Sequence, residues 1–178
     1  MPKDIYDMLD EEIRSIAGGD KSALAALYHH VRTPVYTYSL SILKDRSEAE
    51  DALHDTVLEI WRSAPGYKSI GKPMGWVIAI ARSICLMKLR ERQRLADEPP
   101  DAAYLADDGD LTAEDITVIR ACMETLGEDE REVVILHAVS GLRHRDIAAT
   151  LDQPLSTVLS RYNRAIKKLR KTLEGALR

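Results

Sequence analysis

The chain has 178 residues, of which 45% are hydrophobic, and it carries a net charge of −4. That length accommodates one ordinary domain or two small ones, and the hydrophobic content argues against general disorder. No apolar run approaches the roughly 20 residues needed to span a bilayer, and the acidic N-terminus does not have the pattern of a secretory signal. We therefore expect a cytoplasmic protein with no membrane insertion.

Helical spacing dominates the sequence and no strand-like alternation stands out, which predicts an all-α fold. The first predicted helix covers about residues 3–17 and ends at Gly18-Gly19, a suitable C-terminal cap. A second helix begins after the N-cap residue Asp20. Pro34 should interrupt or kink this helix, because proline lacks an amide hydrogen and clashes with the preceding turn.

Two further helices follow in the first part of the chain. A capping box formed by Ser47 and Glu50 predicts the start of a third helix, which ends near Arg62. Pro73 suits the first turn of a fourth helix that reaches about Gln93. These four segments predict a first helical domain over residues 1–94.

An acidic stretch separates this domain from the rest of the chain. Residues 95–111 contain Pro99-Pro100, Gly109 and several acids, with no Lys or Arg, so no helical stripe is present. This composition predicts a flexible linker between two small helical domains, residues 1–94 and 112–178. Thr112 with Asp115 should begin the next helix, and three more short helices follow.

The last fifty residues combine a helix-turn-helix pattern with a strongly basic second helix. The apolar positions spaced to pack two short helices across a tight turn are Ile147, Ala148, Leu151, Leu155, Val158 and Tyr162. Ser156 is the expected N-cap of the second helix, whose free amides can meet a phosphate. The candidate contacts to duplex DNA are Ser156, Thr157, Ser160, Arg161, Arg164 and Lys167. Lys167, Lys168 and Arg170 supply salt-sensitive affinity or merely keep a helix face solvated.

Two segments of the first domain also carry candidate contact residues. The third helix has an apolar stripe made of Ala49, Leu53, Val57, Ile60 and Trp61. Asp51, His54 and Asp55 lie on another face, which alone indicates only a solvated surface. The cations of the fourth helix that lie roughly on one side are Arg82, Lys88 and Arg92. Cations beside aromatic rings suit a groove for single-stranded nucleic acid, although basic helices are common.

Four motifs in a fixed order connect these features. They are ALAALYHHV, SEAEDALHDTVLEIWR, GWVIAIARSICLMKLRERQR and, after the acidic stretch, LGEDEREVVILHAVSGLRHRDIAATLDQPLSTVLSRYNRAIKKLRK. Over about residues 12–174 the chain resembles the extracytoplasmic-function (ECF) sigma factors, the small sigma subunits of bacterial RNA polymerase. The resemblance implies a transcription initiation factor that is not an enzyme and that binds core RNA polymerase, promoter DNA and an anti-sigma factor.

The resemblance also implies a role for each matching segment. Asp51, His54 and Asp55 would bind polymerase. The −10 single strand, including a flipped base, would be bound by Tyr67, Lys68, Lys72, Trp76, Arg82, Ser83, Lys88 and Arg90. The helix that begins near Ser156 would read the −35 element as duplex DNA.

The chain departs from the family pattern at four positions. Ser83 and Met87 stand where the family usually has Asn and Asp, and Leu159 stands at a position that is often basic. Asp152 replaces the turn glycine, but Asp tolerates the left-handed conformation. These changes leave promoter preference open. They also leave two alternatives: a decoy that binds an anti-sigma factor without supporting transcription, and a simple helix-turn-helix regulator.

No other constellation predicts chemistry. The histidines, His29, His30, His54, His137 and His144, do not have the spacing of a metal site, so we expect no metal and no cofactor. Cys85 and Cys122 are interpreted as buried small hydrophobic residues, with a redox switch as the sharper alternative. Trp61 and Trp76 are expected in the core.

Overall fold

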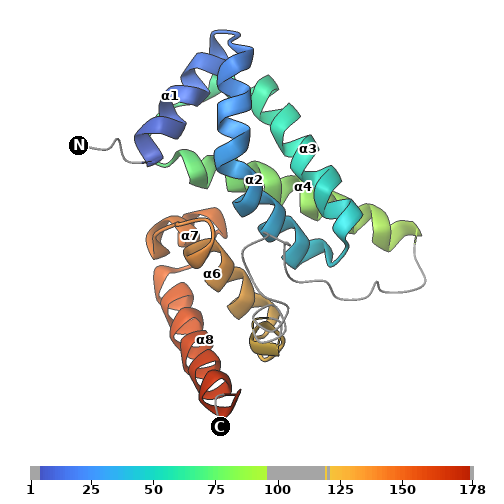
Figure 1. The fold of residues 1–178 in the computed structure, drawn as a ribbon, viewed down its shortest axis with the longest axis vertical. Helices are drawn as coiled ribbons and strands as arrows, with labels where there is room; N and C mark the ends of the chain where they lie inside the picture. Colours follow the sequence, from blue (N-terminus) through green and yellow to red (C-terminus); the bar gives the residue numbers. More distant parts are fainter. Residues whose placement is uncertain (1–4, 96–118, 120, 177–178) are drawn as a thin grey trace.

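A computed structural model describes residues 5–95, 119 and 121–176. The N-terminal helices are α1 (Ile5–Ala17), α2 (Lys21–Leu43), α3 (Arg46–Ser63) and α4 (Pro73–Leu95), with a short 3-10 turn, η1 (Ala64–Gly66), after α3. The C-terminal helices are α6 (Glu128–Ala138), α7 (His144–Thr150) and α8 (Leu155–Ala176). Figure 1 shows the two groups at opposite ends of the molecule. The described residues contain no strand, so the prediction of an all-α fold is confirmed.

The predicted linker lies outside the described residues, except that Leu95 is the last residue of α4. The helix start predicted at Thr112 also lies outside them. None of the helices in the described part of the chain is long and apolar enough to cross a membrane.

The boundary between α1 and α2 follows the predicted capping residues. Gly19 has a φ of 89°, and its N–H donates to the Ile16 carbonyl. The Asp20 carboxylate accepts the N–H groups of Ser22 and Ala23 at 2.8 and 3.4 Å. These bonds satisfy amides that the first turn of a helix leaves free, which is why α2 begins here.

The start predicted for α3 is wrong by two residues. Asp45 rather than Ser47 is the N-cap, and its carboxylate accepts the Glu48 N–H at 2.8 Å. Lys44 ends α2 in the left-handed conformation at a φ of 57°, so the connection between the helices is shorter than expected. Asp45 is therefore the first residue free to cap α3, and it is as good an N-cap as serine.

Pro34 does not interrupt α2, contrary to the first of the two expected outcomes. The helix is continuous from Lys21 to Leu43. Pro34 is itself buried, and Val31, Val35 and Tyr38 around it are fully buried in a helix that packs against α1, α3, α4 and α6. Burial of these side chains contributes several kcal/mol, which exceeds the roughly 3 kcal/mol that a proline costs inside a helix.

Each group of helices surrounds buried apolar side chains. The N-terminal group buries residues that include Leu9, Ile13, Leu27, Ile60, Val77 and Ile78, and the C-terminal group buries Val133, Leu136, Leu142, Ile147, Val158 and Ala165. The two sets form one continuous cluster. Trp61 and Trp76 are only half-buried and pack against its surface. Cys85 and Cys122 are buried, as predicted.

The helix-turn-helix is formed by α7, a tight turn and α8. Ile147, Ala148, Leu151 and Val158 are buried as predicted, whereas Leu155 is exposed, so its predicted packing role is wrong. Asp152 adopts the left-handed conformation with a φ of 52°, which confirms the expected turn.

The start and length of α8 also differ from expectation. The Pro154 carbonyl accepts the Thr157 and Val158 N–H groups at 3.0 and 3.3 Å, so α8 begins at Leu155. Ser156 therefore lies inside the first turn and is not the N-cap, because the helix begins two residues earlier than a serine cap at this position predicts. At 22 residues, α8 is also not a short helix.

Candidate nucleic-acid and polymerase interface

A row of exposed polar side chains follows one face of α8. Its members are Ser156, Ser160, Arg164 and Lys167, and all four are exposed. Their spacings of four, four and three residues keep them on one side of a helix with 3.6 residues per turn. Thr157, at the edge of this row, is half-buried. The structure therefore brings four of the six residues predicted to contact duplex DNA onto one accessible surface.

Arg161 differs from the other cations of α8 because it faces α6. One of its guanidinium nitrogens lies 2.6 Å from an Asp129 carboxylate oxygen, and another donates to the Gln153 side chain. Its side chain is only 17% exposed. The sequence placed Arg161 among the DNA contacts, whereas the geometry uses it to fix α8 against α6 and the turn.

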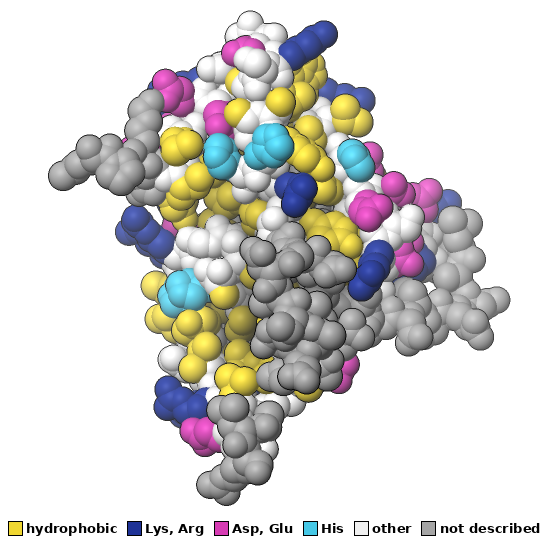
Figure 2. Space-filling view, in the orientation of Figure 1, with side chains coloured by type: hydrophobic (Ala, Val, Ile, Leu, Met, Phe, Trp, Pro, Cys, Tyr) yellow, Lys and Arg dark blue, Asp and Glu magenta, His cyan; other side chains and the backbone are white. Residues whose placement is uncertain are grey.

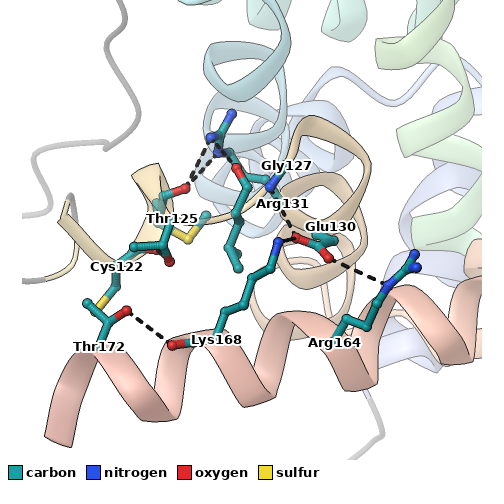
Figure 3. Close-up of polar contacts among 10 residues, drawn as sticks. Cys122, Thr125, Gly127, Glu130, Arg131, Arg164, Lys168 and Thr172 are labelled. Atoms are coloured by element: carbon teal, nitrogen blue, oxygen red, sulfur yellow. Dashed lines mark hydrogen bonds and ion pairs between the residues drawn. The ribbon is translucent and has the colours of Figure 1, made fainter. Parts of the chain in front are cut away.

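Glu130 links the start of α6 to α8 (Figure 3). Its carboxylate accepts the Gly127 N–H at 3.1 Å and the Lys168 ammonium at 2.6 Å, and the Arg164 guanidinium lies 3.6 Å away. The bond from Lys168 is the main reason that the pKa of Glu130 lies below its ordinary value. Glu130 thus caps α6 and pairs with two cations of α8 at once.

Three rings hold α7 against the other C-terminal helices. The centroids of His137 and His144 lie 4.4 Å apart in a stacked arrangement, and Tyr162 meets both rings edge-on. The His137 Nδ1 atom lies 2.9 Å from the Leu142 carbonyl. Burial, with a smaller contribution from His137, lowers the pKa of His144, which favours the neutral form of that ring.

The exposed face predicted on α3 is present. Asp51, His54 and Asp55 are all exposed, while Ala49, Leu53 and Ile60 on the other side are buried. This arrangement follows from the amphipathic pattern of the helix.

A groove of about 660 Å³ lies between α3 and α4. Its lining includes Asp55, Leu58, Trp76, Ser83 and Met87. The side chains of Leu58 and Met87 are 53% and 57% exposed. The sequence analysis did not identify Leu58 as a residue of this surface. An apolar side chain three residues after Asp55, outside the apolar stripe of the helix, was a signal that could have indicated it. The groove places a residue predicted to bind polymerase beside residues predicted to bind DNA.

The cations of α4 are largely engaged by carboxylates. Lys88 Nζ lies 3.2 Å from the Asp55 carboxylate, and Arg82 Nε lies 3.8 Å from Glu132 on α6. Arg92 pairs with Glu48 and also donates to the Leu43 carbonyl at 3.1 Å. Arg90 is exposed. Most of the cations that the sequence predicted on one side of this helix are therefore paired with carboxylates within the fold.

The segment before α4 is anchored to α1 through Asp10. The Asp10 carboxylate accepts the Tyr67 hydroxyl at 2.6 Å and also contacts Ser69 and Arg14. Burial raises the pKa of Asp10, but these donors outweigh it and the pKa falls below its ordinary value. The Tyr67 and Trp76 rings pack with centroids 4.8 Å apart.

Two of the remaining −10 candidates lie in the same segment. Lys68 is exposed, as is its neighbour Ile70, whereas Lys72 forms a 2.6 Å ion pair with Asp146 on α7.

The face seen in Figure 2 shows Lys and Arg side chains scattered among acids and apolar groups rather than gathered in one basic field. The part of the chain that the structure describes contains no group of three or more His, Cys, Asp or Glu placed to hold a metal ion.

Comparisons with known proteins agree with this architecture. The family described as sigma-70 region 2 matches residues 27–95, and the family described as sigma-70, region 4 matches residues 116–169. The ECF RNA polymerase sigma factor SigK of Mycolicibacterium vanbaalenii is 29% identical over 175 residues, which cover 93% of this chain and 89% of that protein. The protein of the same name from Mycobacterium sp. strain KMS is 30% identical over 175 residues, covering 93% and 90%.

Two solved structures share the fold. The chain matches CnrH in complex with the cytosolic domain of CnrY with a TM-score of 0.64 and 19% identity, covering 92% of this chain and 96% of that one. It matches the sigma factor RpoE in complex with the anti-sigma factor NepR from Bartonella quintana with a TM-score of 0.67 and 23% identity, covering 87% and 98%. With both sigma-70 regions matched in order and a 30% identical relative spanned along its length, the chain belongs to the ECF family of RNA polymerase sigma factors.

Proposed function

We propose that this sigma factor directs core RNA polymerase to a bipartite promoter and assists initiation, without catalytic chemistry of its own. Core polymerase and promoter DNA are its partners, and the cytoplasm is its place of action. An anti-sigma factor is proposed as its regulator, with support from the two structural neighbours, each of which was solved with a bound chain. The observation that carries the proposal is the exposed polar row on α8.

The α8 row has the dimensions of a recognition surface. From Ser156 to Lys167 it extends about 16 Å along the helix axis, because each residue adds about 1.5 Å. A major groove about 12 Å wide admits such a helix. In this proposal Ser156, Ser160 and Arg164 contact base edges or phosphates, and Lys167 contacts phosphate. Thr157 borders the surface, and Arg161 positions α8 through Asp129.

The N-terminal helices are proposed to bind polymerase and the −10 strand. Residues 1–94 would form this domain and residues 112–178 the −35 domain, with 95–111 as the linker. Asp51, His54 and Asp55 would dock on polymerase. The −10 strand would contact Tyr67, Lys68, Lys72, Trp76, Arg82, Ser83, Lys88 and Arg90.

The groove between α3 and α4 gives this proposal a specific feature. Its lining offers one hydroxyl, from Ser83, beside apolar side chains that include Met87 and Trp76. The charged lining residues are Asp55, Glu59 and Arg62. A base that enters it would be selected by shape and apolar contact more than by an amide. The Lys88–Asp55 ion pair joins the polymerase and DNA surfaces, so docking at one is expected to affect the other.

Reconstituted transcription with core polymerase tests the proposal. Promoters mapped after overexpression would serve as templates. The Arg164→Ala variant should lower initiation without lowering core binding, whereas Asp51→Ala with Asp55→Ala should lower core binding. Lys21→Ala, which removes an exposed cation at the start of α2, is the matched control and should behave as wild type.

Two results would contradict the proposal. Failure of the wild-type chain to bind core polymerase would exclude a sigma role. Tight binding of an anti-sigma factor without promoter-dependent transcription would instead support the decoy, which the presence of Ser83 and Met87 at the groove favours as the alternative.

A further inference from the structure

Three rings from three different helices meet in the C-terminal group. His137 lies in the last turn of α6, His144 is the first residue of α7, and Tyr162 belongs to α8. The two imidazoles stack with centroids 4.4 Å apart, and the tyrosine ring meets them edge-on with centroid separations of 5.0 and 4.6 Å. We call these three residues the ring cluster. Because each ring comes from a different helix, the ring cluster holds α7 and α8 in place against α6.

Tyr162 connects the ring cluster to the exposed polar row of α8. It lies two residues after Ser160 and two residues before Arg164, so it is on the opposite side of the helix from both. Val158 and Ala165 are fully buried on the side that carries Tyr162. A displacement of the rings would therefore move Ser160 and Arg164 relative to bound DNA. A movement of about 1 Å is enough to break hydrogen bonds whose lengths are roughly 2.7–3.2 Å.

The geometry of the ring cluster suits a neutral His144. Within the described residues, its Nε2 atom is buried and has no hydrogen-bond partner. In a neutral imidazole one ring nitrogen carries no hydrogen, whereas a protonated imidazole donates from both nitrogens. A protonated His144 would thus have a buried N–H donor without an acceptor, which costs free energy.

The stacked neighbour makes a positive charge on His144 less favourable still. The Nδ1 atom of His137 lies 2.9 Å from the Leu142 carbonyl, which can only accept, so Nδ1 is the donor. Two protonated imidazoles in contact would repel each other. Burial is the main reason that the pKa of His144 lies below its ordinary value of 6.5, and His137 adds to the effect.

The acids of α6 and α7 do not offer a protonated imidazole a ready partner. In the described part of the chain, each of these acids already has a cation. The pairs are Glu128 with Lys44, Asp129 with Arg161, Glu130 with Lys168 and Arg164, Glu132 with Arg82, and Asp146 with Lys72. A protonated ring would have to displace one of these cations to gain an acid.

The other charged groups on the neighbouring elements leave this conclusion unchanged. Arg143 and Arg145 adjoin His144 in sequence, and Asp7 of α1 lines the same pocket as these two cations. Asp152, in the turn after α7, lies about 10 Å from His144 along the helix axis. Glu174 lies near the far end of α8. Two cations therefore flank the ring directly, and they disfavour a third positive charge.

We propose that His137 and His144 are positioning residues for α8 that act as neutral rings, so that proton uptake by the pair weakens the binding of duplex DNA. This inference rests on the proposed function, because it takes α8 as the helix that reads duplex DNA. A displaced His144 would titrate at its ordinary 6.5, whereas the positioned ring binds the proton less well. The positioned arrangement is therefore favoured above pH 6.5 and loses its advantage as the pH falls below that value.

His144→Phe separates the titration from the packing. Phenylalanine keeps an aromatic ring against His137 and Tyr162, takes up no proton, and loses no hydrogen bond at the Nε2 position. His137→Asn is a second variant, because its amide can donate to the Leu142 carbonyl while the neighbouring imidazole is removed. His29→Gln removes an exposed imidazole from α2 and is the matched control.

Anisotropy titrations of the full chain with a rhodamine-labelled, mixed-sequence duplex measure the affinity at pH 7.5 and pH 5.5. The ionic strength is held constant because phosphate contacts depend on salt. For each protein the measured quantity is the ratio of its affinities at the two pH values, and dividing by the ratio for His144→Phe removes the effect of all other titrating groups. Circular dichroism at both pH values reports whether the helices remain folded.

Wild type should lose about three- to tenfold in affinity at pH 5.5 relative to His144→Phe, because one proton shifts an equilibrium by at most about tenfold per pH unit. His137→Asn should show a smaller loss, and His29→Gln should behave as wild type. The circular dichroism of wild type should be the same at both pH values, since α8 is displaced without unfolding.

Three results would overturn the positioning role. The first is an equal pH profile for wild type and His144→Phe. The second is wild-type binding that tightens relative to the variant at pH 5.5, which would mean that a protonated His144 contacts phosphate. The third is loss of helical signal by wild type at pH 5.5. If His144→Phe does not fold at pH 7.5, His137→Asn decides, and a profile identical to wild type overturns the role.

Failure of the positioning role and failure of the proposed function give different results. If wild type initiates at its promoter with core polymerase but has the same pH profile as His144→Phe, only the positioning role is wrong. If the wild-type chain does not bind core polymerase, the proposed function is wrong whatever the pH profile.

Discussion

The strongest single test of the C-terminal fold is removal of the Glu130 carboxylate. In Glu130→Ala the Gly127 N–H loses its acceptor and the Lys168 ammonium loses a bond of 2.6 Å. A neutral hydrogen bond contributes about 0.5–1.5 kcal/mol and a charged one about 1.5–3 kcal/mol. Lys168 and Arg164 remain partly in water and can be rehydrated, so we take about 2 kcal/mol as the loss in the free energy of unfolding.

Thermal unfolding followed by circular dichroism measures this loss. For a chain of this size 1 kcal/mol corresponds to about 2–4 °C, so the midpoint should fall by about 4–8 °C. Glu130→Gln keeps an acceptor for Gly127 and should cost about half as much. Glu124→Ala removes an exposed acid from the same region and should leave the midpoint unchanged.

The contribution of Glu130 to the free energy of unfolding should change with pH in one direction. Lys168 chiefly holds the pKa of Glu130 below its usual 4.5. A carboxyl whose pKa is depressed by folding stabilises the protein above its unfolded pKa, and the contribution is lost as the pH falls through the folded value. The gap between wild type and Glu130→Gln should thus be full at pH 7 and narrow below about pH 4.5. A gap under about 0.5 kcal/mol, or one that is unchanged at pH 3, would refute the assigned role of Glu130.

Three other substitutions test separate features. Lys167→Ala should weaken duplex binding and reduce the slope of log affinity against log salt by about one, as measured by anisotropy titrations with mixed-sequence duplex; an unchanged slope argues against a phosphate contact. Asp152→Gly should raise the free energy of unfolding in urea by about 0.5 kcal/mol, because glycine adopts the left-handed turn without strain, and a lower value would contradict this. Tyr38→Phe leaves Glu132 without its hydroxyl donor and should lower the free energy of unfolding by about 1–2 kcal/mol; an equal thermal midpoint would contradict the buried bond.

Local signals in the sequence predicted much of the fold correctly. Asp20 and Gly19 mark the boundary between α1 and α2, and the apolar period of α3 predicts which side is buried. Such features depend on residues within one or two turns, so they can be read without tertiary contacts. The starts predicted at Ser47 and Ser156 were both wrong by two residues, because in each case the connection before the helix ends two positions earlier.

The candidate site was predicted less completely. The exposure of Ser160, Arg164 and Lys167 follows from helical spacing and is present in the structure. The engagement of Arg161 by Asp129 does not follow, because nothing local to α8 specifies which of its cations faces α6. Leu58 was missed because it lies outside the apolar stripe of α3 and was named neither with that stripe nor with the polar face.

The amino-acid pattern was sufficient to establish helices, their exposed faces and the family, since these depend on short-range periodicity and on the order of motifs along the chain. Only the tertiary structure decided which charges are available. Lys72, Arg82 and Lys88 are equivalent cations in the sequence, yet each lies beside a different acid in space. Those acids come from positions between 33 and 74 residues away, and pairing over such distances is set by how the helices pack rather than by any local preference.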